Sequence, residues 1–177
     1  CFVSSDYLAD PQRLREDVLE PLMLMLVTAQ DRAPVHASAF TADGLAIVLA
    51  GRSGSGKSCL ARAADDAGFQ LLSDDDVYVQ RAPALRVWGW PTAAHLLPPD
   101  AAGADWPIRI RNAKTKFAVP LRSASLAAVG CAQAVLCVLT HGETAALRPL
   151  ATADALERLW PLDPGCDLLP GPIAAAI

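Results

Sequence analysis

The chain has 177 residues, of which 53% are hydrophobic, and a formal net charge of −4. This length and composition allow a sizeable buried core and favour one domain over residues 1–177. The weakly acidic balance provides no overall positive field, which argues against a nucleic-acid partner. The most apolar stretch near the start, residues 22–29, is too short to cross a bilayer and lacks signal-peptide features, so we expect no membrane association.

The five cysteines are scattered along the chain and include no C-x-x-C pair. Their odd number and spacing argue against a disulfide framework and a zinc site, and they favour a reducing cytoplasm. The first residue is Cys1 rather than methionine, so we allow for natural residues before it.

The first predicted element is a helix over residues 14–30, where acidic residues come early and apolar residues come later. Pro21 should kink this helix or mark its true start, and we expect the apolar stripe to pack against the core. We therefore divide the chain into an N-terminal helical segment, residues 1–34, and a core domain, residues 35–160.

Two strands follow, at residues 35–41 and 45–50, with Asp43 and Gly44 between them. An Asp-Gly pair between two apolar runs is typical of a β-hairpin. The second strand should therefore have an antiparallel neighbour that precedes it in sequence.

The segment from Gly51 to Ser58 matches the phosphate-binding motif G-x-x-x-x-G-K-[ST], and a predicted helix over residues 58–64 follows it. The loop amides can bind one anion at the helix N-terminus, Lys57 can reach the β and γ phosphates of a nucleotide, and the Ser58 hydroxyl can bind Mg²⁺. The residues assigned to the nucleotide are Gly51, Ser53, Gly54, Ser55, Gly56, Lys57, Ser58 and Cys59.

Gly68 should end the helix, and residues 69–73 form a short apolar strand that runs into Asp74, Asp75 and Asp76. The carboxyl ends of strands face the ligand crevice in an α/β sheet. One of the first two carboxylates can hold Mg²⁺ while the other accepts a proton from an attacking hydroxyl. Asp76 is the member of the run most typical of a solvated side chain.

A hairpin of strands at residues 77–80 and 85–90 comes next, and residues 91–107 are predicted to be a surface loop with one short helix. A basic cluster then includes Arg109, Arg111, Lys114 and Lys116. It is either a solvated face or the source of a lid cation for a transferring phosphoryl group, with Lys114 and Lys116 the better candidates. We interpret His95, His141 and the tryptophans as packing or surface residues.

Residues 135–139 form a continuous apolar run, which predicts a central strand buried on both faces. Residues 145–150 are predicted to be an edge strand that ends at Pro149, and residues 152–160 an amphipathic helix. The tail beyond Pro161 is rich in proline and glycine and carries no clear pattern.

The residues at 35–38, 45–58 and 68–77 resemble the core of the HPr kinase/phosphorylase family, and more closely its short relatives from bacterial peptide maturation, including that of lasso peptides. The resemblance implies an α/β nucleotide-binding fold like that of phosphoenolpyruvate carboxykinase, with a mixed sheet flanked by helices. It also implies that Asp74 is the catalytic carboxylate, that Asp75 supports the metal and that His36 lies against the phosphates. By its spacing alone, a lone strand histidine such as His36 is more typical of a satisfied core residue.

The leading hypothesis is therefore a cytoplasmic kinase that uses ATP and Mg²⁺ to phosphorylate a serine of a peptide or small protein. The resemblance favours the C-terminal serine of a lasso precursor peptide and leaves a homo-oligomer open. The glycine-rich signature with an embedded glutamate, carried by the full bifunctional enzymes, is not found, and residues 114–120 stand in its place. The alternatives are a small-metabolite kinase of the shikimate-kinase type and a nucleotide-binding module without transfer activity.

Overall fold

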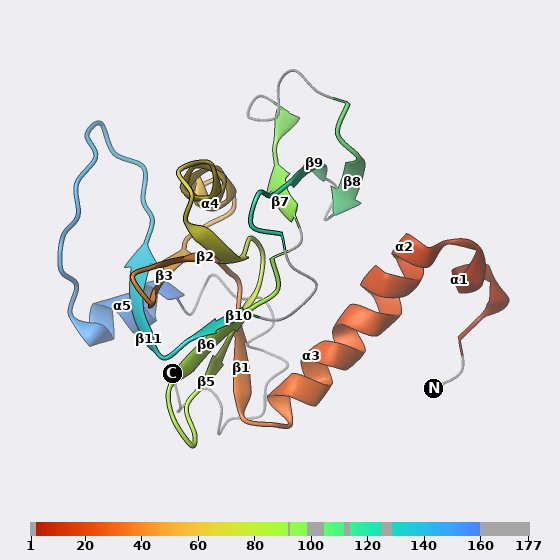
Figure 1. Ribbon diagram of the computed structural model, residues 1–177, viewed down its shortest axis with the longest axis horizontal. Coiled ribbons are helices and arrows are strands. Elements are labelled where there is room, and N and C mark those ends of the chain that lie inside the picture. The colour runs from red at the N-terminus through yellow and green to blue at the C-terminus, as the bar shows by residue number, and fades with distance from the viewer. Residues whose placement is uncertain (1–2, 92, 99–104, 112–113, 125–128, 160–177) are drawn as a thin grey trace.

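The computed structural model describes residues 3–91, 93–98, 105–111, 114–124 and 129–159 (Figure 1). The helical elements are α1 (Ser5–Ala9), α2 (Pro11–Leu14), the π-helical turn η1 (Arg15–Leu19), α3 (Glu20–Thr28), α4 (Lys57–Asp66) and α5 (Thr152–Leu159). The strands are β1 (Arg32–Val35), β2 (Ala37–Ala42), β3 (Leu45–Ala50), β4 (Gln70–Ser73), β5 (Val77–Gln80), β6 (Arg86–Gly89), β7 (Ala93–Leu96), β8 (Ile108–Arg111), β9 (Lys114–Pro120), β10 (Val129–Cys131) and β11 (Gln133–Val138).

The strands form three sheets rather than the one mixed sheet predicted. Sheet A has the order β1-β5-β6-β10, sheet B the order β11-β3-β2-β4, and sheet C the order β7-β9-β8. In sheet B, β3 is parallel to β11 and antiparallel to β2, and β2 is antiparallel to β4. The mixed α/β class is thus confirmed, and so is the antiparallel hairpin, since Asp43 and Gly44 both have the positive φ of a type I′ turn.

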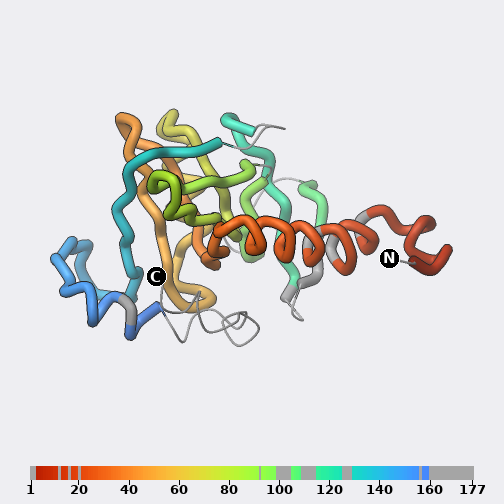
Figure 2. Tube along the Cα trace, turned by 90° about the horizontal axis from the view of Figure 1, so that it is seen from below, coloured from red at the N-terminus to blue at the C-terminus, as the bar shows by residue number. Residues whose placement is uncertain are grey.

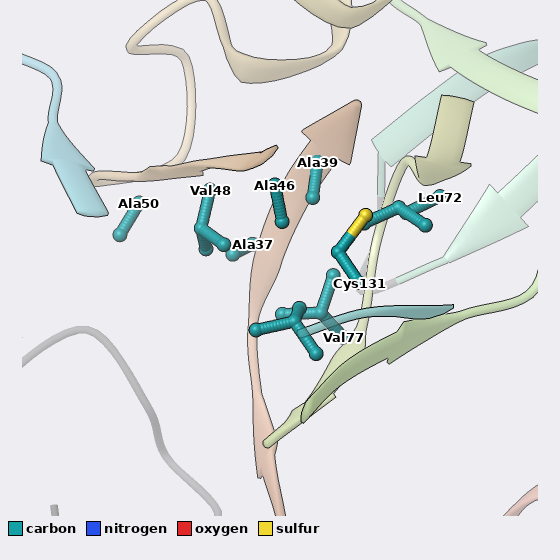
Figure 3. Packing of buried hydrophobic residues seen from close by; sticks show 9 residues of the cluster. Ala37, Ala39, Ala46, Val48, Ala50, Leu72, Val77 and Cys131 are labelled. Carbon is teal, nitrogen blue, oxygen red and sulfur yellow. The ribbon is translucent and has the colours of Figure 1, made fainter. Parts of the chain in front are cut away.

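Sheets A and B pack face to face around the main hydrophobic core (Figure 3). Small side chains of β2 and β3 meet Leu72 of β4, Val77 of β5 and Cys131 of β10. The sheets approach closely at Gly89, where an added Cβ would overlap the carbonyl group of Leu72. Glycine at this position therefore permits β6 to cross β4 without displacing either backbone.

A second core lies on the other face of sheet B, beneath α4 and sheet C. Ala61 of α4 and Leu71 of β4 pack there with Ala94 and Leu96 of β7 and with Val119 of β9. Helix α4 ends as predicted at Gly68, whose amide donates to the carbonyl of Asp65 while that of Phe69 donates to Ala64, so the last turn is closed by a Schellman motif. The molecule thus has three layers, with sheet B in the middle (Figure 1).

The N-terminal helices do not pack against the core, and the prediction that they do so is wrong. Elements α1 to α3 extend away from the sheets (Figures 1 and 2). Leu22, Met23, Leu24, Met25 and Leu26 are all exposed, by between 38% and 68%. Pro21 stands at the start of α3, directly after η1, so the helical rod continues through it with a π-helical turn instead of a break.

Three predictions for the second half of the chain need correction. Strand β11 is an outermost strand of sheet B, beside β3, and its Val135 and Leu136 are exposed by 45% and 40%. It is therefore not a central strand buried on both faces. Residues 145–150 form no strand, and the predicted loop over residues 91–107 contains β7. The predicted C-terminal helix is confirmed as α5, while the tail beyond Pro161 lies outside the described residues.

None of the helices formed by the described residues is long and apolar enough to cross a membrane.

Candidate functional site

The residues that the sequence singles out lie along one edge of sheet B, the edge at which β3, β4 and β11 end and β2 begins. Because β4 and β11 run in the same direction as β3, their carboxyl ends meet at the same edge, together with the amino end of β2. The phosphate-binding motif leaves β3 at this edge, Asp74 leaves β4, and His36 enters β2. The order along the edge places β2 between the motif and the acidic run.

His36 and the acids are also neighbours because the chain crosses between sheets at both places. Residue 36 joins β1 of sheet A to β2 of sheet B, and residues 74–76 join β4 of sheet B to β5 of sheet A. Val35 pairs with Val77 on one side of the crossing, and Ala39 pairs with Ser73 on the other. The two crossing segments must therefore lie side by side.

The motif loop adopts a conformation that depends on its glycines. Gly54 and Gly56 have φ of 88° and 94°, a region that side chains rarely adopt, and a Cβ added at either one would meet nothing within 4 Å. Gly56 is the N-cap of α4, and the amide of Leu60 donates to its carbonyl oxygen over 2.9 Å to begin the helix. The loop thus leaves open space at the N-terminus of a ten-residue helix, which favours anions.

Polar groups of this loop fit a phosphate ligand. The Ser55 Oγ is buried and has no hydrogen-bond partner among the described residues. Lys57 is only 8% exposed, and its Nζ donates to the carbonyl oxygens of Gly51 and Arg52 over 2.6 and 3.4 Å. A buried ammonium group and a buried hydroxyl beside a helix N-terminus are donors that suit an anion such as a phosphate.

Asp74 is nearly buried, at 5% exposure. Its Oδ1 lies 3.2 Å from the Ser38 hydroxyl, which also donates to the Asp74 carbonyl oxygen over 2.5 Å. Its Oδ2 accepts the backbone amide of His95 over 2.6 Å. The carboxylate is therefore held in one orientation by β2 on one side and β7 on the other.

His36 faces the next two acids. Its Nδ1 lies 3.6 Å from Oδ1 of Asp75 and 3.6 Å from Oδ1 of Asp76. The carboxylate of Asp76, above all, raises the pKa of His36, and that of Asp75 adds to it, whereas burial and the ammonium of Lys57 oppose the rise. His36 also lies near the motif loop, because the next residue, Ala37, pairs with Ala50, the last residue of β3 before the loop.

The three acids thus have different surroundings. Asp74 contacts Ser38 and His95, while Asp75 and Asp76 contact His36. The Asp76 side chain is 42% exposed, which agrees with its prediction as the solvated member, although it also pairs with His36. No group of three or more histidine, cysteine or acidic side chains among the described residues is arranged to hold a metal ion by itself.

The basic cluster lies on β8 and β9, which pair as antiparallel strands in sheet C. Lys114 and Lys116 lie on β9, where Lys116 pairs with Arg109 of β8. His95 of β7 pairs with Ala118, two residues beyond Lys116, so His95 and Lys116 share the face of sheet C that is opposite to the apolar core. The register therefore places Lys116 on the same face of sheet C as the histidine that contacts Asp74.

Sequence reasoning missed two residues of this site, His95 and Ser38. His95 is the more consequential, because its Nδ1 lies 3.4 Å from Oδ2 of Asp74. Its side chain is only 14% exposed, which agrees with the interpretation of His95 as a packing residue, but that interpretation overlooked the contact with Asp74. His95 belongs to no motif, and Ser38 carries no chemical signal of its own within the segment 35–38. Ser38 approaches Asp74 because β2 pairs with β4, and His95 approaches it because its amide donates to the Asp74 carboxylate. The one available signal was that Ser38 stands two residues after His36 in the strand predicted at residues 35–41.

Comparison with known proteins adds little to this geometry. Neither a protein-family model nor a curated protein sequence matches the chain. Among solved structures, the HPr(Ser) kinase/phosphatase from Coxiella burnetii is similar with a TM-score of 0.31 and 17% identity, over 60% of this chain and 86% of that one.

Proposed function

We propose that this protein is a Mg²⁺-dependent kinase that transfers the γ-phosphoryl group of ATP to a serine hydroxyl of a peptide or small protein. The observation that carries the proposal is the convergence of the motif loop, His36 and the acidic run at one edge of sheet B. A phosphate-binding loop by itself requires only an anion. A buried, oriented carboxylate at the same edge adds a group able to accept a proton from a hydroxyl.

The chain's own residues divide the work in this proposal. The loop amides and Lys57 bind the phosphates, and Lys57 exchanges its contacts with the carbonyls of Gly51 and Arg52 for phosphate oxygens. Asp74 takes the proton of the serine hydroxyl as the new O–P bond forms and the bond to the ADP oxygen breaks. His36 provides positive charge beside Asp75 and Asp76, and Lys116, on the same face of sheet C as His95, is the candidate lid cation for the transferring phosphoryl group.

Mg²⁺, when bound, would offset the negative charge of the phosphates. Ser58 and Asp75 would hold it, because a hydroxyl and a carboxylate are the oxygen ligands that this ion prefers. Mg²⁺ commonly takes one or two protein oxygens and completes its shell with phosphates and water, so these two residues need no larger protein cluster.

The acceptor of this kinase is proposed to be a peptide, in line with the resemblance of residues 35–80 to the short kinases of peptide maturation. That resemblance favours a serine at the C-terminus of a precursor peptide. The antiparallel hairpin of β2 and β3 supports this proposal over a shikimate-type kinase, in which we expect no such strand before the loop.

The proposal is tested by incubating the protein with ATP, Mg²⁺ and candidate precursor peptides and measuring an added phosphate by mass spectrometry. Replacing Asp74 with asparagine should preserve nucleotide binding and abolish transfer. Asp43→Asn is a matched control, because Asp43 lies in the hairpin turn at the opposite end of β2 and asparagine tolerates its positive φ. Transfer by Asp74→Asn at the wild-type rate would refute the role assigned to this carboxylate.

A nucleotide-binding module without transfer activity is the second candidate, and one observation favours it. Both oxygens of Asp74 already accept hydrogen bonds from the protein, as a purely structural carboxylate would. This candidate predicts ATP binding without phosphate on any hydroxyl acceptor. It also predicts a loss of folding stability in Asp74→Ala, which removes an acceptor from the buried amide of His95.

A further inference from the structure

We infer that His95 is a positioning residue for the Asp74 carboxylate and that it acts through a proton on its Nδ1. This inference rests on the proposed function, because it concerns the group that takes the proton of the acceptor hydroxyl. His95 belongs to none of the sequence motifs, and the inference gives it a role in the site.

The first observation is that His95 meets Asp74 twice. Its backbone amide donates to Oδ2 over 2.6 Å, and its imidazole Nδ1 lies 3.4 Å from the same oxygen. Among the described strands, β7 pairs with β9 alone, so its other edge is available to this carboxylate. Asp74 thus satisfies an amide at the open edge of β7, and the imidazole is held beside it.

The second observation concerns the burial of this contact. The His95 side chain is 14% exposed and that of Asp74 is 2% exposed, and Nδ1 has no hydrogen-bond partner among the described residues. A bare Nδ1 would direct its lone pair at a carboxylate oxygen in a region with little water, which is unfavourable. A protonated Nδ1 instead becomes a donor that a small rotation of the ring can direct at Oδ2.

The consequence is a carboxylate held from both sides. The Ser38 hydroxyl lies 3.2 Å from Oδ1, while the amide and the imidazole of His95 both face Oδ2. Such an arrangement leaves the remaining lone pairs of the carboxylate in fixed directions, as transfer from a serine hydroxyl requires. The amide persists in every side-chain variant at position 95, so substitutions isolate the contribution of the imidazole.

Two substitutions of similar size separate positioning from packing. In His95→Asn the side-chain amide can take the place of Nδ1 and donate to Asp74, whereas in His95→Gln the amide falls nearer to the place of Nε2. We expect His95→Gln to lower kcat about 10-fold to 100-fold, the value of one hydrogen bond to a charged group, and His95→Asn to restore most of it. The KM for ATP should not change in either variant, because neither touches the motif loop.

His141→Gln is the matched control, since His141 is exposed and should leave kcat unchanged. Equal kcat for wild type, His95→Gln and His95→Leu would overturn the inference without affecting the proposed kinase activity. An equal loss in His95→Asn and His95→Gln, accompanied by a fall in melting temperature, would also overturn it, because that result indicates packing alone.

A second measurement does not depend on transfer. The chain has three histidines, so ¹⁵N labelling of histidine and comparison with His36→Gln and His141→Gln identify the ring of His95. We expect its Nδ1 to carry a proton and its signal to move in Asp74→Asn. A bare Nδ1 would overturn the inference. Failure of the wild-type protein to transfer phosphate to any acceptor would contradict the proposed function itself.

Discussion

At the scale of single residues, the site depends on which carboxylate each histidine faces. His36 pairs with Asp75 and Asp76 near the motif loop, whereas His95 pairs with Asp74 at the border of sheet C. The two histidines therefore divide the acidic run between them. The positive charge that His36 gains on protonation offsets the repulsion between the neighbouring carboxylates of Asp75 and Asp76.

The raised pKa of His36 predicts a pH-dependent contribution to stability. Its folded-state pKa lies above the ordinary value of about 6.5, so the ion pair stabilises the fold below that pH and the effect is lost as pH rises through the raised pKa. His36→Gln should lower the free energy of unfolding at about pH 6 by less than about 1 kcal/mol, because the side chain is 37% exposed, and have no effect near pH 9. Urea unfolding of both proteins at the two pH values measures this difference, and a larger loss at pH 9 would contradict it.

The residue scale also shows what the sequence could predict. The motif loop, His36 and the acids are recognisable because each chemical group stands next to an apolar strand or at a spacing that a phosphate ligand requires. Ser38 and His95 carry no such pattern. Their contact with Asp74 depends on the crossing between sheets A and B and on the edge of sheet C, which no local sequence feature reveals.

At the scale of elements, hairpins and caps were predicted well because a few residues determine them. Asp43-Gly44 sets the turn between β2 and β3, and Gly68 ends α4. Burial was predicted poorly. The apolar runs of α3 and β11 have the composition of core elements, but many of their side chains are exposed. Composition alone does not indicate whether another element packs against such a run.

Because α3 is exposed, replacing one of its apolar residues with a charged residue should have little effect on the stability of the isolated chain. Met25 is 68% exposed, and lysine has a similar helix propensity, so Met25→Lys should change the free energy of unfolding by no more than about 0.5 kcal/mol. Leu72→Lys is the contrasting variant, because Leu72 is fully buried between the sheets and a charge there should prevent folding. Thermal unfolding compares the two. A loss in Met25→Lys that approaches that of a core variant would mean that α3 is packed in solution.

At the scale of the whole molecule, the site depends on how sheet C is fixed to the central layer. Asp65, at the end of α4, is fully buried and accepts the amides of Arg122 and Ser123 and the Ser123 hydroxyl, over 2.7, 2.9 and 2.6 Å. These residues follow β9 directly. Asp65 therefore fixes the end of sheet C against α4, and sheet C in turn brings His95 to Asp74.

Removing this clamp should weaken both stability and the site. Asp65→Ala should cost about 3 kcal/mol of unfolding free energy, whereas the adjacent Asp66→Ala, which breaks an exposed pair with Arg62, should have a much smaller effect. Burial would raise the pKa of Asp65, but its hydrogen bonds to Ser123 and Arg122 outweigh burial and lower it. The contribution of the ionised Asp65 to stability is thus present above about pH 4 and disappears as the pH falls through the lowered pKa. The stabilities of the wild type and Asp65→Ala should therefore converge in acid. Equal stability of the two variants at neutral pH would contradict the clamp.

The central claim is that the edge of sheet B is a hydroxyl kinase site with Asp74 as the group that accepts the proton. The most direct test compares wild type, Asp74→Asn and Lys57→Met for ATP binding by calorimetry and for phosphate transfer to a precursor peptide by mass spectrometry. We predict that wild type binds and transfers, that Asp74→Asn binds but transfers at least about 100-fold more slowly, and that Lys57→Met does neither. Wild-type transfer by Asp74→Asn, or ATP binding without transfer by the wild-type protein to any hydroxyl acceptor, would contradict the claim.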